Sequence, residues 1–388
     1  MITKRDIIVF DEAHTIETHL TEFNAISISE FRCKQIGIPF KKQVKMGEAI
    51  KWLKDNYTPA LATKIIKLGS QVQEILDECS MDSRAPTRDE LNIISTHKEL
   101  VAHNDSINEQ LILQPYETVY NEYVLINESN TVFKFKELYG RKNFKKYVLP
   151  MADKFLFMSS TILDKDAFCD ELGIDPAEAA FISVESEFDV DNRPVIYLPT
   201  ARMTYGWNTP ERAKESNLMY ARIEEILNTL HPDESGIIHA GSFQIAERLV
   251  KNLENKTPHY IMHHNPGCGK KRDDIINEFQ ELDGVTKLLI SPSITEGLDL
   301  KDDKGRFAIF AKVPFPYLGD AWVKKRMELS ESWYRRQALI SMILGGGRVV
   351  RSSEDWGHVY ILDSAFRKLL SSSKRMLPKW WVDSITTM

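Results

Sequence analysis

The chain has 388 residues, a formal net charge of −6, 43% hydrophobic residues and 27% charged residues. These values are typical of a globular protein with a sizeable core and room for two or three domains. No apolar run approaches the length of a membrane-spanning helix, and residues 1–25 lack a signal-peptide pattern. Four scattered cysteines without a C-x-x-C pair fit reduced thiols in a cytoplasmic or nucleoid-associated protein. The net charge does not indicate nucleic-acid binding, but a local basic groove can lie on an acidic protein.

The first predicted element is a short buried strand, I-I-V-F at residues 7–10, which leads directly into D-E-A-H. Residues 18–135 are predicted to form a mostly helical insert, because most of this stretch has apolar residues at i, i+3, i+4 spacing. Thr87, followed by two acidic residues, predicts the start of one helix. Towards the end of the insert, two alternating runs within residues 118–138 flank N-E-S-N and predict a β-hairpin.

Strands and helices are predicted to alternate over the rest of the chain. The segment K-F-L-F-M-S-S-T-I-L (154–163) is a second buried strand that ends in hydroxyl groups, and a long helix is expected around residues 321–344 before the last strand H-V-Y-I-L-D (358–363). This alternation predicts an α/β fold with a doubly wound parallel sheet. Ligands of such sheets bind at the carboxyl ends of the strands, so the residues that follow strands are the candidates for function.

The D-E-A-H tetrapeptide places two carboxylates at the carboxyl end of the first predicted strand. Nucleotide hydrolysis requires Mg²⁺ at the phosphates and a group that orients the attacking water. Asp11 and Glu12 suit these two roles and are the candidate Mg²⁺ ligands, while His14 would couple the site to its surroundings by hydrogen bonds. The alternative is a chance tetrapeptide.

Further stretches follow in the order found in one helicase group. The chain resembles superfamily 2 DNA helicases of the XPD/DinG type in M-S-S-T-I-L (158–163, motif III), E-F-D-V-D-N-R-P-V (187–195), H-A-G-S (239–242, motif IV), S-P-S-I-T-E-G-L-D-L (291–300, motif V), V-P-F-P (313–316) and G-G-G-R-V-V-R-S-S-E-D-W-G (345–357, motif VI). The resemblance extends from residue 7 to residue 363, and motifs V and VI are its most specific parts.

The resemblance implies a RecA-like P-loop NTPase helicase core with a mostly helical insert. We expect a partial first motor domain (1–17 and 136–185), an arch-like insert (18–135) and a complete second motor domain (186–388). It further implies an ATP-dependent DNA helicase, with ATP and Mg²⁺ as cofactors, which moves 5′ to 3′ on single-stranded DNA.

Motif VI supplies two candidate arginines. Arg348 and Arg351 follow a run of three glycines that ends at Gly347, and i, i+3 spacing allows both side chains to face one triphosphate. Arginines from a second domain commonly stabilise charge in phosphoryl transfer. A pair of surface arginines in salt bridges is the alternative.

Motif V and motif III supply the remaining candidates around the nucleotide. In motif V, Glu296, Gly297 and Asp299 would contact nucleotide or orient an arginine, although a solvated acidic turn is the alternative. In motif III, the resemblance implies that Ser159 and Thr161 link the ATP and DNA sites.

Four residues are candidates for contact with DNA. Ser242 occupies the motif IV position at which the family brings a hydroxyl to a DNA phosphate. Lys270, Lys271 and Arg272 cluster at the start of a predicted helix and could meet phosphates, but a solvated charged turn explains them equally well.

The chain has no stretch with the phosphate-binding spacing G-x-x-x-x-G-K-[ST]. N-P-G-C-G-K-K (265–271) comes nearest, but His264 and Lys271 occupy positions that require glycine and Ser/Thr. We therefore expect a separate P-loop-bearing N-terminal segment or chain, and no ATPase activity from this chain alone. Without the neighbouring P-loop strand, strand 7–10 would leave a long apolar edge, which we expect another chain, a crystal contact or a rearranged segment to cover. A non-hydrolysing DNA-binding or regulatory module is the alternative function.

The resemblance also bears on iron–sulfur chemistry. Where the group has an iron–sulfur cluster, its cysteines precede the D-E-A-H sequence, whereas all four cysteines here follow it. We therefore expect no iron–sulfur cluster ligands in this chain.

Overall fold

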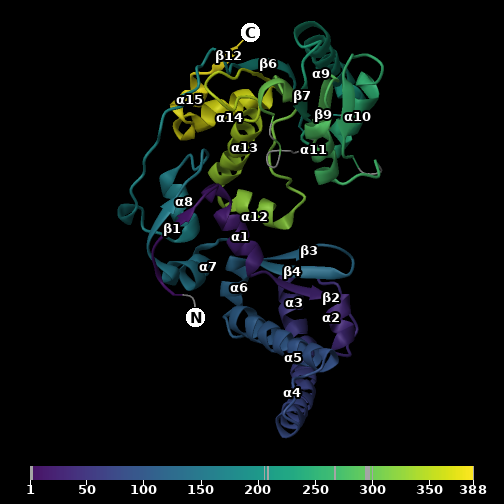
Figure 1. Ribbon diagram of the computed structural model, residues 1–388, viewed down its shortest axis with the longest axis vertical. Helices are drawn as coiled ribbons and strands as arrows, with labels where there is room; N and C mark the ends of the chain where they lie inside the picture. The colour runs from purple at the N-terminus through teal and green to yellow at the C-terminus, as the bar shows by residue number, and fades with distance from the viewer. Residues whose placement is uncertain are drawn as a thin grey trace. The chain divides into compact units, whose positions relative to one another are not determined.

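The computed structural model describes residues 3–204, 206–207, 209–265, 268–292, 298 and 300–387. These residues divide into two compact units, which are described separately (Figure 1). Unit 1 comprises residues 1–158, 168–178 and 318–328, and unit 2 comprises residues 159–167, 179–317 and 329–388. Within the described ranges, no helix is long and apolar enough to cross a membrane.

Unit 2 is built on a seven-stranded sheet in the order β12-β6-β11-β10-β7-β9-β8, and every neighbouring pair is parallel. Its strands are β6 (Val195–Ala201), β7 (Gly236–His239), β8 (Tyr260–His263), β9 (Lys287–Ser291), β10 (Phe307–Phe310), β11 (His358–Asp363) and β12 (Ile385–Thr387). The predicted α/β fold with a parallel sheet is confirmed.

Helices cover both faces of this sheet because its strands are apolar on both sides. On one face Ile237 and Leu289 pack against α11 (Arg272–Glu281), α13 (Glu331–Gly346), α14 (Ala365–Ser373) and α15 (Lys379–Val382). On the other face Ile238 and Ile290 pack against α9 (Ala213–Glu225) and α10 (Phe243–Leu253). Successive side chains along each strand therefore point alternately into two hydrophobic cores, one on each face of the sheet, as in other doubly wound sheets.

Unit 1 contains two small sheets. Strands β1 (Arg5–Phe10) and β5 (Ala152–Phe157) form a parallel pair, while β2 (Ile26–Ser29), β4 (Val132–Glu137) and β3 (Tyr123–Asn127) form an antiparallel sheet. The antiparallel β3–β4 pair confirms the predicted hairpin. The helices of this unit are α1 (Ile16–Phe23), α2 (Glu30–Gln35), α3 (Met46–Trp52), α4 (Thr58–Met81), α5 (Arg88–Ile107), α6 (Tyr116–Glu122), α7 (Arg141–Asn143), most of α8 (Lys165–Leu172) and most of α12 (Ala321–Leu329).

The tip of the α4–α5 hairpin is closed by side-chain hydrogen bonds. Thr87 Oγ1 accepts the backbone N–H of Glu90, and the Glu90 carboxylate accepts the backbone N–H of Thr87, which is a capping box. Arg84 donates two hydrogen bonds to the same carboxylate, at 2.8 and 2.9 Å. The predicted helix start at Thr87 is therefore confirmed.

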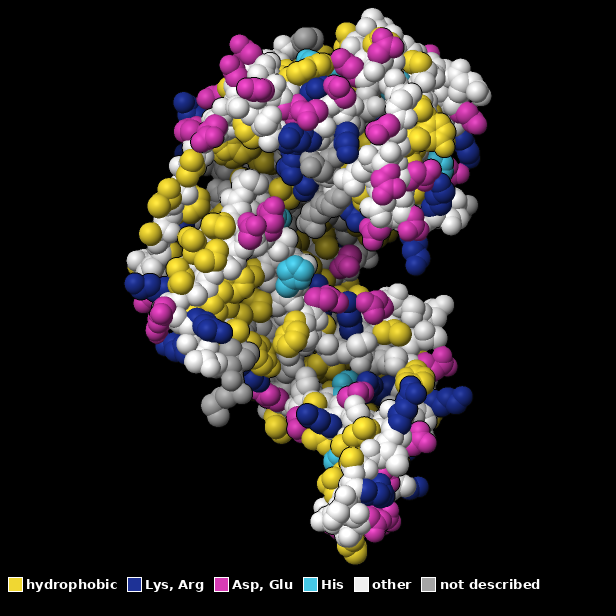
Figure 2. Space-filling view, viewed as in Figure 1, with side chains coloured by type: hydrophobic (Ala, Val, Ile, Leu, Met, Phe, Trp, Pro, Cys, Tyr) yellow, Lys and Arg dark blue, Asp and Glu magenta, His cyan; other side chains and the backbone are white. Residues whose placement is uncertain are grey.

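The first strand differs from its prediction in burial. Ile7 and Val9 of β1 are 52% and 51% exposed, whereas Phe10 on the opposite face stacks on Phe157 of β5 with ring centroids 5.5 Å apart. Hydrophobic side chains gather over this region in the space-filling view (Figure 2). The expectation of a strand buried on both faces was wrong, because the parallel pair has its aromatic core on one side only.

The long helix expected around residues 321–344 is two helices. Ser330 separates α12 from α13, and its Oγ accepts the backbone N–H of Trp333 at 3.1 Å, so a serine N-cap starts a new helix there. Residues 318–328, which the sequence placed in the second motor domain, pack within unit 1.

Candidate functional site

The D-E-A-H residues form a tight turn at the carboxyl end of β1, followed by the short helical turn η1 (Ala13–Thr15). Glu12 has a left-handed backbone with φ of 47°, which is uncommon for a residue with a side chain. Its N–H donates to Asp11 Oδ1 at 2.9 Å, and the Glu12 carboxylate lies 3.4 Å from Nδ1 of the nearly buried His14. The Asp11 and Glu12 residues are exposed, so both carboxylates are accessible to a ligand.

Backbone hydrogen bonds fix this turn to the strand that leads into motif III. Ala13 N–H donates to Met158 O at 2.9 Å, and Met158 N–H donates to Phe10 O at 2.8 Å. In the residues that follow, the Ser159 and Thr161 hydroxyls lie 3.2 Å apart, and Thr161 N–H donates to Ser159 Oγ. Motif III therefore continues directly from the strand that supports the acidic turn.

Motif VI follows the end of α13 in unit 2. Gly347 caps the helix, the half-buried Arg348 donates from Nη1 to Leu298 O at 3.3 Å, and Arg351 is exposed. Asp355, whose side chain is fully buried, accepts the backbone N–H of Arg351 at 3.0 Å. This carboxylate also accepts a 2.6 Å hydrogen bond from Arg306, so the loop that carries Arg351 is anchored beneath its surface.

A buried histidine lies under the glycine run. His239 ends β7 and stacks on Phe310 of β10, with ring centroids 4.6 Å apart. A Cβ on Gly345 would lie 3.1 Å from His239 Nε2, so a side chain at this position would press against the His239 ring. Burial, together with the positive charge of Arg348, lowers the pKa of His239 to about 4.

Sequence reasoning assigned no role to His239, Arg306 or Asp355. Asp355 lies inside the motif VI string and could have been found there, because its position matches the family pattern. The buried contacts of Arg306 and His239 carry no local signal, since the partners are far away along the chain: Asp355 lies 49 residues after Arg306, and Phe310 and Gly345 follow His239 at still greater distances.

The candidates for DNA contact have local partners. Ser242 Oγ caps α10 by accepting the N–H of Ile245 at 3.3 Å. Lys270 pairs with Glu278, and Arg272 donates to Asp273 at 3.2 Å. Lys271 precedes α11 and donates its backbone N–H to Asp274. These contacts account for the residues structurally and leave their DNA contact a prediction.

The candidates thus fall into separate groups. Asp11, Glu12 and His14 lie together in unit 1, whereas Gly347, Arg348 and Arg351 lie together in unit 2. The motif V candidates Glu296, Gly297 and Asp299 lie outside the described residues.

The acidic turn fits a magnesium ion by the chemistry of its donors. Asp11 and Glu12 offer exposed carboxylate oxygens, the ligand type that Mg²⁺ prefers.

The cysteines lie outside this turn: Cys33, Cys79 and Cys169 are buried and Cys268 is half-buried. Within the described part of the chain, no group of three or more His, Cys, Asp or Glu side chains could hold a metal ion.

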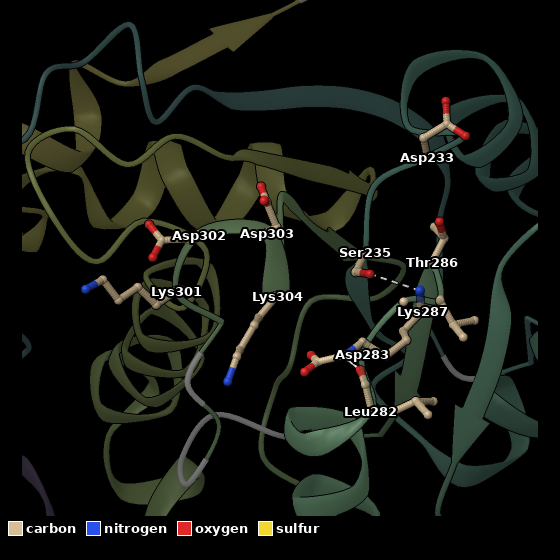
Figure 3. A pocket seen from close by; sticks show the side chains of 12 residues that line it. Asp233, Ser235, Leu282, Asp283, Thr286, Lys287, Lys301, Asp302, Asp303 and Lys304 are labelled. Atoms are coloured by element: carbon tan, nitrogen blue, oxygen red, sulfur yellow. Dashed lines mark hydrogen bonds between the residues drawn. The ribbon is translucent and has the colours of Figure 1, made fainter.

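A pocket of about 510 Å³ lies in unit 2 (Figure 3). Ser235, just before β7, and Lys287, the first residue of β9, face each other there through a 2.9 Å hydrogen bond from Lys287 N–H to Ser235 Oγ. The pocket is thus at the amino ends of the strands, whereas ligands of parallel sheets bind at the carboxyl ends. The position of this pocket therefore does not support nucleotide binding there.

Comparison with known proteins identifies relatives of part of the chain. Residues 226–384 match the family model of the helicase C-terminal domain. Human regulator of telomere elongation helicase 1 is 29% identical over 102 residues, which cover 22% of this chain and 8% of the relative. The chicken Fanconi anemia group J protein homolog is 28% identical over 120 residues, which cover 28% of this chain and 10% of the relative. The matches therefore span about a tenth of these relatives' length.

The fold has counterparts among solved structures. An XPD helicase and an apo XPD structure each align with 98% of this chain at a TM-score of 0.52 and 16% identity, over 68% and 77% of the respective solved chains. Identity at this level establishes similarity of fold. Residues 226–384 are thus similar to helicase C-terminal domains, and the fold of the chain resembles that of XPD helicases.

Proposed function

We propose that this chain provides part of the motor of an ATP-dependent DNA helicase of the XPD type, acting on single-stranded DNA. The observation that carries the proposal is the acidic turn at the end of β1, where the exposed Asp11 and Glu12 are held to the motif III strand by two backbone hydrogen bonds. A protein that only binds DNA has no need for such a turn.

The proposal assigns a role to each half of the nucleotide site. Asp11 and Glu12 would hold a bound Mg²⁺ ion, and this ion would neutralise the charge of the phosphates. Glu12 would orient the attacking water, with His14 restraining its carboxylate from 3.4 Å away. Arg348 and Arg351 would stabilise the negative charge that develops on the phosphates.

We further propose that a P-loop-bearing segment outside these 388 residues cradles the phosphates. The sequence contains no G-x-x-x-x-G-K-[ST] stretch. The parallel β1–β5 pair also leaves Ile7 and Val9 half-exposed beside the acidic turn, although parallel sheets are normally covered on both faces and two strands alone are marginal. A P-loop-bearing segment that packs against this face would cover it.

ATP hydrolysis stimulated by single-stranded DNA tests the proposal. We expect no activity from this chain alone and activity when the segment encoded immediately upstream is supplied. Glu12→Gln should then abolish turnover, while Glu247→Gln on α10, which removes an exposed partner of Lys251, should leave it unchanged. Robust hydrolysis by the isolated chain, lost in Glu12→Gln, would refute the need for a separate segment. No hydrolysis in any combination would favour the non-hydrolysing module.

A further inference from the structure

Helix α12 is an excursion of the chain from unit 2 into unit 1. The chain leaves unit 2 after Tyr317, contributes residues 318–328 to unit 1 and returns at Leu329. Only Ser330 then separates α12 from α13, and the far end of α13 leads into Arg348. The segment is thus covalently tied at both ends to the unit that carries the candidate arginines.

Arg326 is the residue that anchors α12 within unit 1. Its side chain is only 2% exposed. Nη2 donates to Glu17 at 3.0 Å and to Glu171 at 3.2 Å, while Nη1 donates to Leu138 O at 2.8 Å. The guanidinium also lies over the Tyr139 ring, 4.3 Å from its centroid. One side chain therefore holds three segments that are far apart in the sequence.

Two of these segments follow closely, along the chain, on the acidic turn and on motif III. Glu17 lies in α1, three residues after His14, and Glu171 lies in α8, the helix that follows motif III. Figure 1 shows α12 beside α1, as the ion pair requires. The third segment, at Leu138, follows strand β4 of the insert, and Trp322 of α12 donates to the neighbouring Glu137 O at 2.7 Å.

Stability alone does not explain such a cluster. Replacing a buried ion pair by apolar side chains is commonly neutral or stabilising, because the two charges must be removed from water. What the planar guanidinium provides is geometry, since its fixed donors can set the directions of several acceptors at once. The contacts of Arg326 thus fix where α1 and α8 lie relative to α12.

We propose that Arg326 is a positioning residue that ties the helix following the acidic turn to the chain segment leading into α13, so that α1 cannot shift independently of α12. In this arrangement Arg326 acts on Asp11 and Glu12 through Glu17. The consequence for ATP turnover rests on the proposed function, whereas the restraint on α1 does not.

Hydrogen exchange on the full chain tests the restraint directly. In Arg326→Met, exchange in α1, α8 and α12 should accelerate at least about tenfold, because these elements open locally once the shared guanidinium is lost. Peptides from β7 and β9 in unit 2 should keep their protection. Arg326→Lys, which keeps the charge but not the fork, should be intermediate. The matched control is Arg222→Met on α9, which removes an exposed pair with Glu225 and should change nothing.

Unchanged exchange in α1, or an equal rise throughout both units, would overturn the proposal. If Arg326→Met does not yield folded protein, Glu17→Gln serves instead, because it removes the charge and keeps an acceptor. Its α1 exchange should also rise, and unchanged protection would again refute the restraint.

Turnover with the P-loop segment present separates positioning from simple stability. In Arg326→Met, kcat should fall at least about tenfold while KM for ATP stays within about twofold, and Arg326→Lys should recover part of the loss. A higher KM with kcat retained would show that Arg326 does not position the acidic pair. If the wild-type protein has no ATPase activity, the proposed function fails, while the exchange experiment still decides the role of Arg326.

Discussion

Arg306 donates a 2.6 Å hydrogen bond to Asp355, and the two side chains are almost entirely removed from solvent. The same guanidinium reaches Asp303 at 2.9 Å, but that carboxylate is fully exposed. One arginine thus has a buried and a surface partner. Only the buried partner also accepts the N–H of Arg351, which makes Asp355 the link between the sheet and the motif VI loop.

The first prediction compares these two partners. Asp355→Asn should lower the free energy of unfolding by about 2–4 kcal/mol, because it leaves Arg306 without its buried counter-charge. Asp303→Asn is the control and should leave the urea midpoint unchanged, since exposed ion pairs contribute little. Equal effects of the two substitutions would contradict a distinct role for the buried carboxylate.

The second prediction concerns pH. Burial lowers the pKa of His103 from 6.5 to about 4, and His103 Nε2 lies 3.0 Å from the hydroxyl of Tyr57 in the core of the insert. Because the folded protein binds this proton more weakly than the unfolded chain does, the stabilisation is complete above pH 6.5 and is lost as pH falls towards 4. The loss from this one group is about 1.4 kcal/mol per pH unit.

The double variant Tyr57→Phe/His103→Phe isolates this contribution, since it removes the titrating group and its partner together. Its free energy of unfolding, measured in urea between pH 7 and pH 4, should fall less steeply than that of the wild type. Tyr57→Phe alone should keep the wild-type slope. An identical slope in the double variant would show that His103 does not titrate with folding.

The third prediction tests the cap at the tip of α4 and α5. Thr87→Ala should cost about 1 kcal/mol locally, because the N–H of Glu90 loses its acceptor. Hydrogen exchange in the first turn of α5 should therefore accelerate about fivefold. Thr87→Ser keeps the hydroxyl and should exchange as the wild type does. Normal protection in Thr87→Ala would mean that the Arg84–Glu90 pair holds the tip by itself.

The fourth prediction concerns the outer face of β1. Ile7→Thr/Val9→Thr keeps β-branched side chains and should leave the unfolding midpoint nearly unchanged, because both residues are half-exposed. It should reduce binding of an apolar dye and weaken association with the P-loop segment. Phe157→Ala on the inner face should instead cost at least about 2 kcal/mol, because its ring packs on Phe10 and Phe168. Full association of the threonine variant would refute this surface as the contact.

The sequence predicted elements whose signals are local. The β3–β4 hairpin and the start of α5 at Thr87 follow from alternation and capping, and each depends on neighbours only a few residues away. The parallel sheet of unit 2 followed from repeated apolar runs. The serine that divides α12 from α13 was missed because its flanking residues share one helical pattern, so only the cap at Ser330 marks the boundary.

Other features depend on partners that no local pattern reveals. The strand I-I-V-F has the composition of a buried strand, yet its burial depends on which elements lie on each face. In the sequence Arg326 is one of three consecutive basic residues on a short helix. Its partners Glu17, Leu138 and Glu171 lie more than 150 residues away along the chain, so no local pattern reveals them. The catalytic assignments of Asp11, Glu12, Arg348 and Arg351 stay predictions, since they depend on chemistry that only assays test.

The excursion of α12 has a practical consequence for dividing this protein. A recombinant piece cut at a single boundary near residue 186 would carry α12 away from the residues that bury it, exposing Trp322 and an unneutralised Arg326. The other piece would retain Glu17 and Glu171 without the Arg326 guanidinium that pairs with them. A division that respects the two units therefore has to keep residues 318–328 with unit 1 and to join Tyr317 to Leu329 in unit 2 by a short linker. Anyone who dissects the chain by sequence alone would read the resulting aggregation as intrinsic instability of the motor domain.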